Sequence, residues 1–397
     1  MESSTGKLRA WWASRQGLTS STAPKTIEAC IKTMGWVPAS GAPTPYLSIR
    51  ARMPDVSRKD VDRVAIDGTH AIEVTGLAGR PHLIVPTANV SVLLNFYSLS
   101  YRAHIAPSLA KDGLTEAALK SVSTQIIAAL DECPLSMSDL RDAVTHRDAS
   151  ILLRIALNDL MLRGVVRRFP SSGRLDSTDY QFELRHPDDR PKIAGDEHRA
   201  EIIAKAVGFF LEHQGPATVD EICWWGDLTK GAARKALEEI GAEPVAVSGW
   251  VDQAWLLSAH AAKWKSFKPE AGDRIAFLPY RDPLMHLRRT PGTLTTATKV
   301  RVLDSVYDKL VAKDIADVTE LDHHAIFVGP ELAGLWDYDP KAKAMVTKLW
   351  LSGVRLKRRV ADEAEELTAF IRDQIGDVKL SAVDPPARRK RRLDFLL

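Results

Sequence analysis

The segment that constrains the fold most is Gly215–Leu257, which predicts two short helices followed by a β-hairpin. Thr218 and Glu221 have the three-residue spacing of a capping box at the start of the first helix, and Gly226 supplies the turn to the second. Two runs of β-type residues flank Ser248–Gly249 closely enough to pair. This order is typical of a winged helix, a fold that can place a helix in the major groove of DNA.

The same order of elements is predicted upstream. An amphipathic helix from Thr115, a short capped helix after Pro134 and a longer helix over Ala149–Arg163 precede two strands, Val165–Phe169 and Tyr180–Leu184. The first strand and the loop of this second hairpin are basic. We therefore expect this wing to lie along DNA phosphates.

A third and less regular copy is predicted at the N-terminus, where three helices precede strands at Ala71–Thr75 and His82–Val85. Between the second and third of these helices lies Gly35–Arg52, whose three prolines exclude a regular helix over its first half. Three units of one architecture in a single chain favour a tandem array.

The composition is that of a globular protein. With 397 residues, 45% of them hydrophobic, the chain can bury substantial cores in two to four domains. It has neither a run of about 18 apolar residues that could span a membrane nor the apolar N-terminal segment of a secretory signal, so we expect a cytoplasmic protein with no membrane partner. The three cysteines are far apart in apolar contexts, which favours reduced core residues.

No metal site or cofactor is expected. His323 and His324 adjoin an aspartate, but neighbouring residues of a strand face opposite sides of the sheet. The net charge of +3 permits nucleic-acid binding without requiring it.

These patterns predict an α+β fold with three tandem winged-helix units, a small β-rich C-terminal domain and a terminal helix. The last segment has two prolines and five consecutive basic residues, so we expect a mobile tail there. The expected boundaries are 1–110 for winged helix 1 with its proline-rich insert, 111–192 for winged helix 2 with the basic wing, 193–262 for winged helix 3, 263–380 for the β-rich domain and 381–397 for the basic tail.

Basic residues gather in three segments, Val165–Arg174, Arg355–Arg359 and Arg388–Arg392. Each could contact phosphates, although a solvated surface is the simpler explanation for any one of them. In the second helix of Gly215–Leu257 the apolar positions fall on one face, which leaves the basic residues pointing elsewhere. The residues predicted to contact DNA are Arg80, Arg167, Arg168, Arg174, Lys230 and Arg234.

Several landmarks taken together resemble the crosslink-unhooking DNA glycosylases, the AlkZ and YcaQ-like proteins. In order, they are RAWWASRQGL near the start, the PYL segment ending at Leu47, GRPHLIVP from Gly79, GPAT with the WW pair ending at Trp225, LPYRDPL from Leu278 and VGPELAGLWDY ending at Tyr338. The resemblance covers nearly the whole chain. It implies a tandem winged-helix protein that removes alkylated bases from DNA, including bases in interstrand crosslinks, without a metal or cofactor.

The resemblance also implies a catalytic motif just ahead of the PYL segment, namely Gln, an aliphatic residue, and then Gln or Asp. Hydrolysis of an N-glycosidic bond needs a side chain that orients or deprotonates water beside a developing oxocarbenium ion. Here the two motif positions hold Pro38 and Ser40, on either side of Ala39. Proline offers no side-chain hydrogen bond, and a serine hydroxyl is a poor base although it can hold a water molecule.

The sequence therefore predicts a monomeric protein of this family that binds duplex DNA, including alkylated or crosslinked DNA, with its catalytic pair replaced. One alternative is an active glycosylase that uses Ser40 with a nearby acid or with His82. Another is a winged-helix transcription regulator. Three DNA-binding-like units in one chain, without an obvious dimerisation helix, disfavour a regulator.

Overall fold

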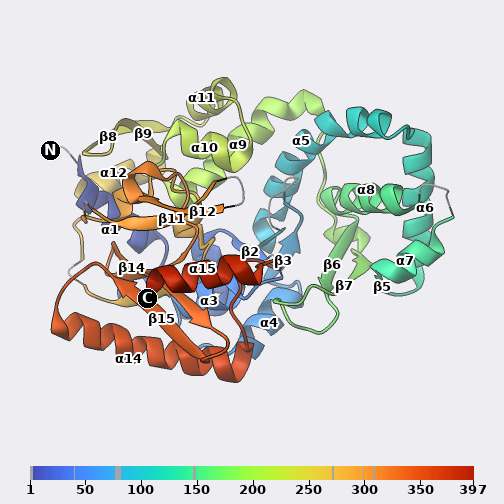
Figure 1. The fold of residues 1–397 in the computed structure, drawn as a ribbon. Coiled ribbons are helices and arrows are strands. Elements are labelled where there is room, and N and C mark those ends of the chain that lie inside the picture. Colours follow the sequence, from blue (N-terminus) through green and yellow to red (C-terminus); the bar gives the residue numbers. More distant parts are fainter. Residues whose placement is uncertain are drawn as a thin grey trace. The chain divides into compact units, whose positions relative to one another are not determined.

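The structure, a computed structural model, describes residues 3–39, 41–76, 82–145, 149–270, 272–297, 299–306 and 309–397 (Figure 1). The chain forms two compact units. Unit 1 combines Met1–Pro38, Ala42–Val61 and Val207–Leu397, and unit 2 combines Ala39–Gly41 and Asp62–Ala206. Among the described residues, no helix is both long and apolar enough to cross a bilayer. Helices and small sheets are mixed throughout, which confirms the α+β prediction.

The first sheet of unit 2 has the strand order β2-β4-β3. β3 (Ala71–Val74) pairs antiparallel with β4 (His82–Pro86), and β2 (Val37–Ala39) borders β4 on its other side and ends in this unit. In the chain, α4 (Arg58–Ile66) comes between β2 and β3, and α5 (Val90–Lys111) follows β4. The two predicted N-terminal strands are thus present.

The next part of unit 2 contains the helices α6, α7 and α8 and a three-stranded sheet of order β5-β7-β6. Caps begin two of the helices, because Thr115 accepts a bond from an amide of α6 and Ser136 forms a capping box with Asp139 in α7. In chain order the elements are α6 (Glu116–Glu132), β5 (Leu135–Ser136), α7 (Met137–Ala143), α8 (Ala149–Leu162), β6 (Val166–Pro170) and β7 (Tyr180–Leu184).

α8 is covered by other parts of unit 2 on most of its surface. Its leucines and Ala156 are buried in the core of this unit. On α5, the Tyr101 hydroxyl donates to the Ile155 carbonyl at 3.0 Å, and the Ser98 hydroxyl donates to that of Leu162 at 3.2 Å. The exposed side chains described on α8 are those of Ser150, Ile151 and Arg154. Little of this helix is therefore free to enter a DNA groove.

The helical part of unit 1 confirms the pattern predicted for Gly215–Leu257. Thr218 and Glu221 form the expected capping box, and Thr229 caps the following helix. The turn differs in detail, because Gly226 ends the first helix and Asp227 takes the left-handed conformation, with φ 52°. The elements are β1 (Ser3–Ser4), α1 (Thr5–Arg15), α2 (Ile27–Met34), α3 (Thr44–Arg50), α9 (Arg199–Gln214, shared with unit 2), α10 (Val219–Gly226), α11 (Lys230–Glu239), β8 (Glu243–Ser248), β9 (Val251–Leu256) and α12 (Ser258–Ser266).

The remainder of unit 1 contains an antiparallel sheet of order β10-β13-β14-β15 and a separate β11-β12 hairpin. Phe327 on β13 and Leu335 on β14, the two central strands of the four-stranded sheet, are fully buried. The elements are β10 (Ile275–Leu278), α13 (Pro283–His286), β11 (Arg301–Val306), β12 (Lys309–Asp314), β13 (His324–Val328), β14 (Glu331–Asp339), β15 (Ala344–Leu349), α14 (Val354–Phe370), which continues as one π turn over Ile371–Ile375, and α15 (Pro386–Leu396).

Two buried arginines connect distant segments of unit 1. Arg52 donates to both carboxylate oxygens of Asp282, at 2.8 and 3.1 Å, and neither side chain is exposed. Arg288 lies 3.5 Å from Glu221, donates to the Gln214 carbonyl at 2.9 Å and packs over the Trp12 ring at 3.9 Å. A buried guanidinium is tolerated only when it is paired, so these contacts determine which segments can assemble.

The prediction of a mobile C-terminal tail is wrong. The basic run forms α15, which contacts β14 and β15 (Figure 1). Arg392 is 2% exposed and bonds Asp337 at 2.9 Å and Asp384 at 2.8 Å. Arg389 bonds Asp377 and donates to the Tyr338 carbonyl at 2.7 Å. Burial of one face of the helix, with its arginines neutralised, outweighs the repulsion within the basic run.

Replacing Arg392 with Met should lower the free energy of unfolding by about 3–5 kcal/mol, because Asp337 would be left buried without its partner. The matched control is Lys390→Met, at an exposed position of the same helix, for which we expect a change within about 0.5 kcal/mol. Chemical denaturation of both variants measures the difference. Equal stability of the two variants would contradict a structural role for the tail.

Two adjacent histidines are buried as neutral hydrogen-bond acceptors in unit 1. The Tyr280 amide donates to His324 Nδ1 at 2.8 Å, and the Leu303 amide donates to His323 Nε2 at 3.2 Å. Burial, reinforced by the positive charge of Arg392, lowers the pKa of His323 to about 3 and the pKa of His324 well below its usual value. One nitrogen of each ring therefore accepts a hydrogen bond from a backbone amide of unit 1.

Acid should destabilise the protein through these histidines. As the pH falls below about 6.5, the unfolded chain takes up protons that the folded chain does not, so stability falls by about 1.4 kcal/mol per pH unit for each histidine. The variant His323→Gln/His324→Asn keeps an acceptor at both places and should show a shallower fall. Denaturation at several pH values between 7 and about 4 tests this, and an unchanged slope in the variant would contradict it.

Candidate nucleic-acid interface

Of the three arginines in the basic wing, the two on β6 point to opposite sides of the strand, as neighbouring strand residues do. On one side, Arg168 Nε lies 2.5 Å from Glu73 Oε1 on β3, and its guanidinium packs 3.8 Å from the centre of the Tyr180 ring. His82 Nδ1, at the start of β4, lies 3.4 Å from the same Glu73 oxygen. Glu73 thus connects the wing to the β3-β4 hairpin.

Burial dominates the electrostatics of this cluster. It raises the pKa of Glu73, opposed by the charge of Arg168. Burial and Arg168 together lower the pKa of His82 to about 3. A neutral imidazole with so low a pKa is a weak base at physiological pH, since an efficient general base has a pKa near the operating pH.

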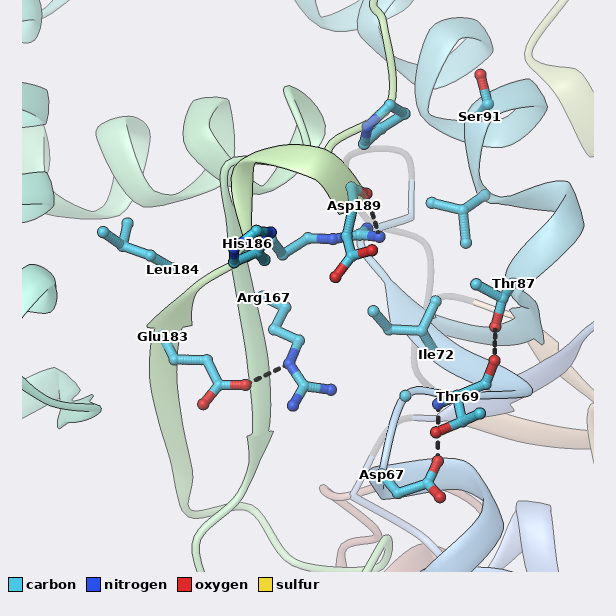
Figure 2. A pocket seen from close by; sticks show the side chains of 14 residues that line it. Asp67, Thr69, Ile72, Thr87, Ser91, Arg167, Glu183, Leu184, His186 and Asp189 are labelled. Carbon is cyan, nitrogen blue, oxygen red and sulfur yellow. Dashed lines mark hydrogen bonds and ion pairs between the residues drawn. The ribbon is translucent and has the colours of Figure 1, made fainter.

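On the other side of β6, Arg167 faces a pocket of about 600 Å³ (Figure 2). Arg167 pairs with Glu183, which lies opposite it in the hairpin register, and donates to the Ile66 carbonyl at 3.3 Å. The close-up shows Arg167 and Glu183 pointing toward each other. The charged residues lining the pocket carry both signs: Asp67, Arg167, Glu183, Arg185 and Asp189. The pocket is therefore not strongly positive.

The third wing arginine is also paired. Arg174 donates two hydrogen bonds to Asp176, at 2.9 and 2.7 Å, and its side chain is 35% exposed. Next to it, the Leu175 amide donates to Asp62 Oδ1 at 3.1 Å, which fastens the wing loop to α4. The charges predicted to meet phosphates thus have carboxylate partners within unit 2.

Lys230 and Arg234, the two residues of α11 that are predicted to contact DNA, are exposed. Ala233, Ala236 and Leu237 are buried on one side of the helix, as its apolar spacing predicts. Lys230 pairs with Asp220 at 2.8 Å at the surface, its side chain 63% exposed, and Arg234 is exposed. Because an exposed ion pair contributes little, Lys230 can exchange this partner for a phosphate at low cost.

The segment predicted to correspond to the family motif lies at the edge of the sheet that contains His82. Pro38 and Ala39 are buried on β2, which borders β4. Ser40 and Arg80 lie outside the described residues. Within the described part of the chain, no group of three or more His, Cys, Asp or Glu side chains could hold a metal ion.

One of the carboxylate partners of the wing arginines follows from the register of the hairpin. Once β6 and β7 are predicted, Glu183 falls opposite Arg167. Glu73 lies 95 positions from Arg168 in the chain, and no local pattern relates the two residues.

The variant Arg168→Met distinguishes a structural arginine from a phosphate contact. It leaves the buried Glu73 unpaired, so we expect a loss of about 3–5 kcal/mol of stability. The loss should be larger at pH 8 than at pH 5, because an unpaired Glu73 can be protonated in acid. Denaturation at the two pH values checks this, with Arg163→Met, an exposed position, as control. Unchanged stability with weakened DNA binding would instead favour a phosphate contact.

Comparison with known proteins points to the family that the sequence landmarks resemble. The family model described as DNA glycosylase AlkZ-like matches residues 31–370. The solved structure of Streptomyces sahachiroi DNA glycosylase AlkZ is similar, with a TM-score of 0.69 and 17% sequence identity over 93% of this chain and 98% of that one. At that identity the structural match shows a shared fold. No curated protein matches the sequence significantly. Since the family model spans most of the sequence, the chain belongs to the AlkZ-like DNA glycosylase family.

Proposed function

We propose that this protein binds duplex DNA as a member of the AlkZ-like family in which the catalytic pair has been replaced. The observation that carries the proposal is Pro38 at the first motif position, buried in β2. Its side chain can neither donate nor accept a hydrogen bond, so it cannot orient the water that hydrolysis of an N-glycosidic bond requires. The family scaffold and its surface remain available for binding DNA.

The polar groups on the neighbouring strands give further support. Glu73 is bonded to Arg168, and His82 lies against the same carboxylate in a buried cluster. A carboxylate held by a guanidinium and an imidazole with a pKa of about 3 are both poor substitutes for a free general base.

The order of elements supports winged-helix units. In unit 2, α6, β5, α7, α8, β6 and β7 follow one another as in a winged helix, and α10, α11, β8 and β9 repeat the later part of that order in unit 1. We propose the N-terminal copy on the same grounds. Because α8 is largely covered whereas α11 is exposed, Lys230 and Arg234 are the favoured DNA contacts. Arg167, Arg168 and Arg174 would contribute less, since each has a carboxylate partner.

An active glycosylase is the second candidate, favoured by the position of His82 on the strand that borders β2. Release of free base from an alkylated duplex by the wild-type protein and by Ser40→Ala distinguishes the two. Release by the wild type alone would assign catalysis to Ser40. Equal release by both would assign it elsewhere, and release by neither supports a protein that only binds.

Binding should depend strongly on salt and little on sequence. The affinity for a random duplex should fall linearly with salt on logarithmic axes, and Lys230→Ala/Arg234→Ala should reduce the slope by about 0.9 for each phosphate that the variant no longer neutralises. Lys120→Ala, at an exposed position on α6, is the control and should leave the slope unchanged. Fluorescence anisotropy at several salt concentrations measures both. A preference of about 10³ or more for one sequence would instead favour a transcription regulator.

A further inference from the structure

The three basic segments of the sequence differ in how far their charges are neutralised. In the wing, Arg167, Arg168 and Arg174 all pair with carboxylates. In the C-terminal run, Arg389 and Arg392 are buried in ion pairs. Lys390 and Arg391 of that run are exposed. In Arg355–Arg359, at the start of α14, three of the four basic side chains are exposed, and Arg359 alone pairs with a described carboxylate.

The basic side chains at the start of α14 are accessible. Arg355, Lys357 and Arg358 are exposed, and none of these side chains forms a hydrogen bond or ion pair with the described residues. Arg359 is partly exposed and pairs with Asp273. Arg355 and Arg358 are three residues apart, so they are neighbours on the surface of the helix.

The distribution of charge along α14 opposes the helix macrodipole. The first half carries four basic residues and the second half four acidic ones, at positions 362, 363, 365 and 366. Cations near a helix N-terminus and anions near its C-terminus are both unfavourable. Gly353, at the N-cap, provides no side-chain cap. Docking through Val360, Ala364 and Leu367 stabilises the helix instead. The basic cluster is thus present at a local cost in stability.

We propose that the exposed side chains of Arg355, Lys357 and Arg358 form an additional contact for DNA phosphates. The inference rests on the proposed DNA-binding function and locates a contact on an element that is not part of any proposed winged helix. The acidic second half of α14 would repel a phosphate strand laid along the helix axis. The helix therefore meets the backbone with its basic end, over one or two phosphates.

The charge reversal Arg355→Glu/Arg358→Glu in the full chain tests this contact. Affinity for a random duplex should fall about tenfold, with a salt slope smaller by about one to two. The thermal midpoint should stay equal to that of the wild type or rise, because the new charges agree with the macrodipole. The control Lys341→Glu/Lys379→Glu makes the same change in net charge at exposed positions elsewhere in unit 1 and should weaken binding much less.

Each other outcome has a distinct meaning. If the wild type binds and the α14 variant binds equally well, or no more weakly than the control, the α14 contact is overturned while the proposed function stands. If the wild type fails to bind any duplex, the proposed function and the contact fail together. If the variant loses binding to vesicles of anionic lipid but keeps its affinity for DNA, the surface serves a membrane and the DNA contact is wrong.

Discussion

A guanidinium that is removed from water has to be surrounded by acceptors, and this requirement organises unit 1. Arg52 joins α3 to the segment that follows β10, through Asp282. Arg288 joins that same segment to the start of α10, through Glu221. Arg392 anchors the C-terminal helix to β14, through Asp337. In each case the two partners are far apart in the sequence, so the pairs act as long-range constraints on how the unit assembles.

The same requirement applies to the arginines of the basic wing in unit 2. A run of arginines on a hairpin suggests phosphate contacts, but here each arginine has a carboxylate partner nearby, and Arg168 is 16% exposed beside Glu73. A buried pair of this kind is costly to open, because separating it leaves two unpaired charges. The wing is therefore better suited to holding the β3-β4 hairpin than to exchanging its partners for DNA. The surface of α11 and the start of α14 have no such constraint.

Features that depend on neighbouring residues could be predicted from the sequence. The capping box of Thr218 and Glu221, the apolar face of α11 and the β6-β7 hairpin follow from spacing and turn chemistry. The tail could not be predicted in this way, because five consecutive basic residues look solvated until Asp337 and Asp384 are brought beside them. The pairing of Arg168 with Glu73 was likewise out of reach, since only the fold brings the two together.

For function, the sequence was informative at the motif and less so at the surface. The presence of Pro38 and Ser40 at the positions proposed for the motif follows from the sequence alone, and the structure adds that Pro38 is buried in β2. Composition does not show which cations of the basic segments are already paired, because their carboxylate partners are brought beside them only by the fold. Ion pairing thus separates the arginines that hold the protein together from the cations that remain available to a polyanion.

Hydrogen–deuterium exchange of the full chain, with and without a random duplex, tests that separation most directly. The first amides of a helix lack partners within it and exchange quickly unless a ligand covers them. We expect slower exchange on DNA binding in the first turns of α11 and α14, with no change in α15 or in the wing loop Ser171–Asp179. New protection confined to the wing loop, with α11 and α14 unchanged, would contradict this separation.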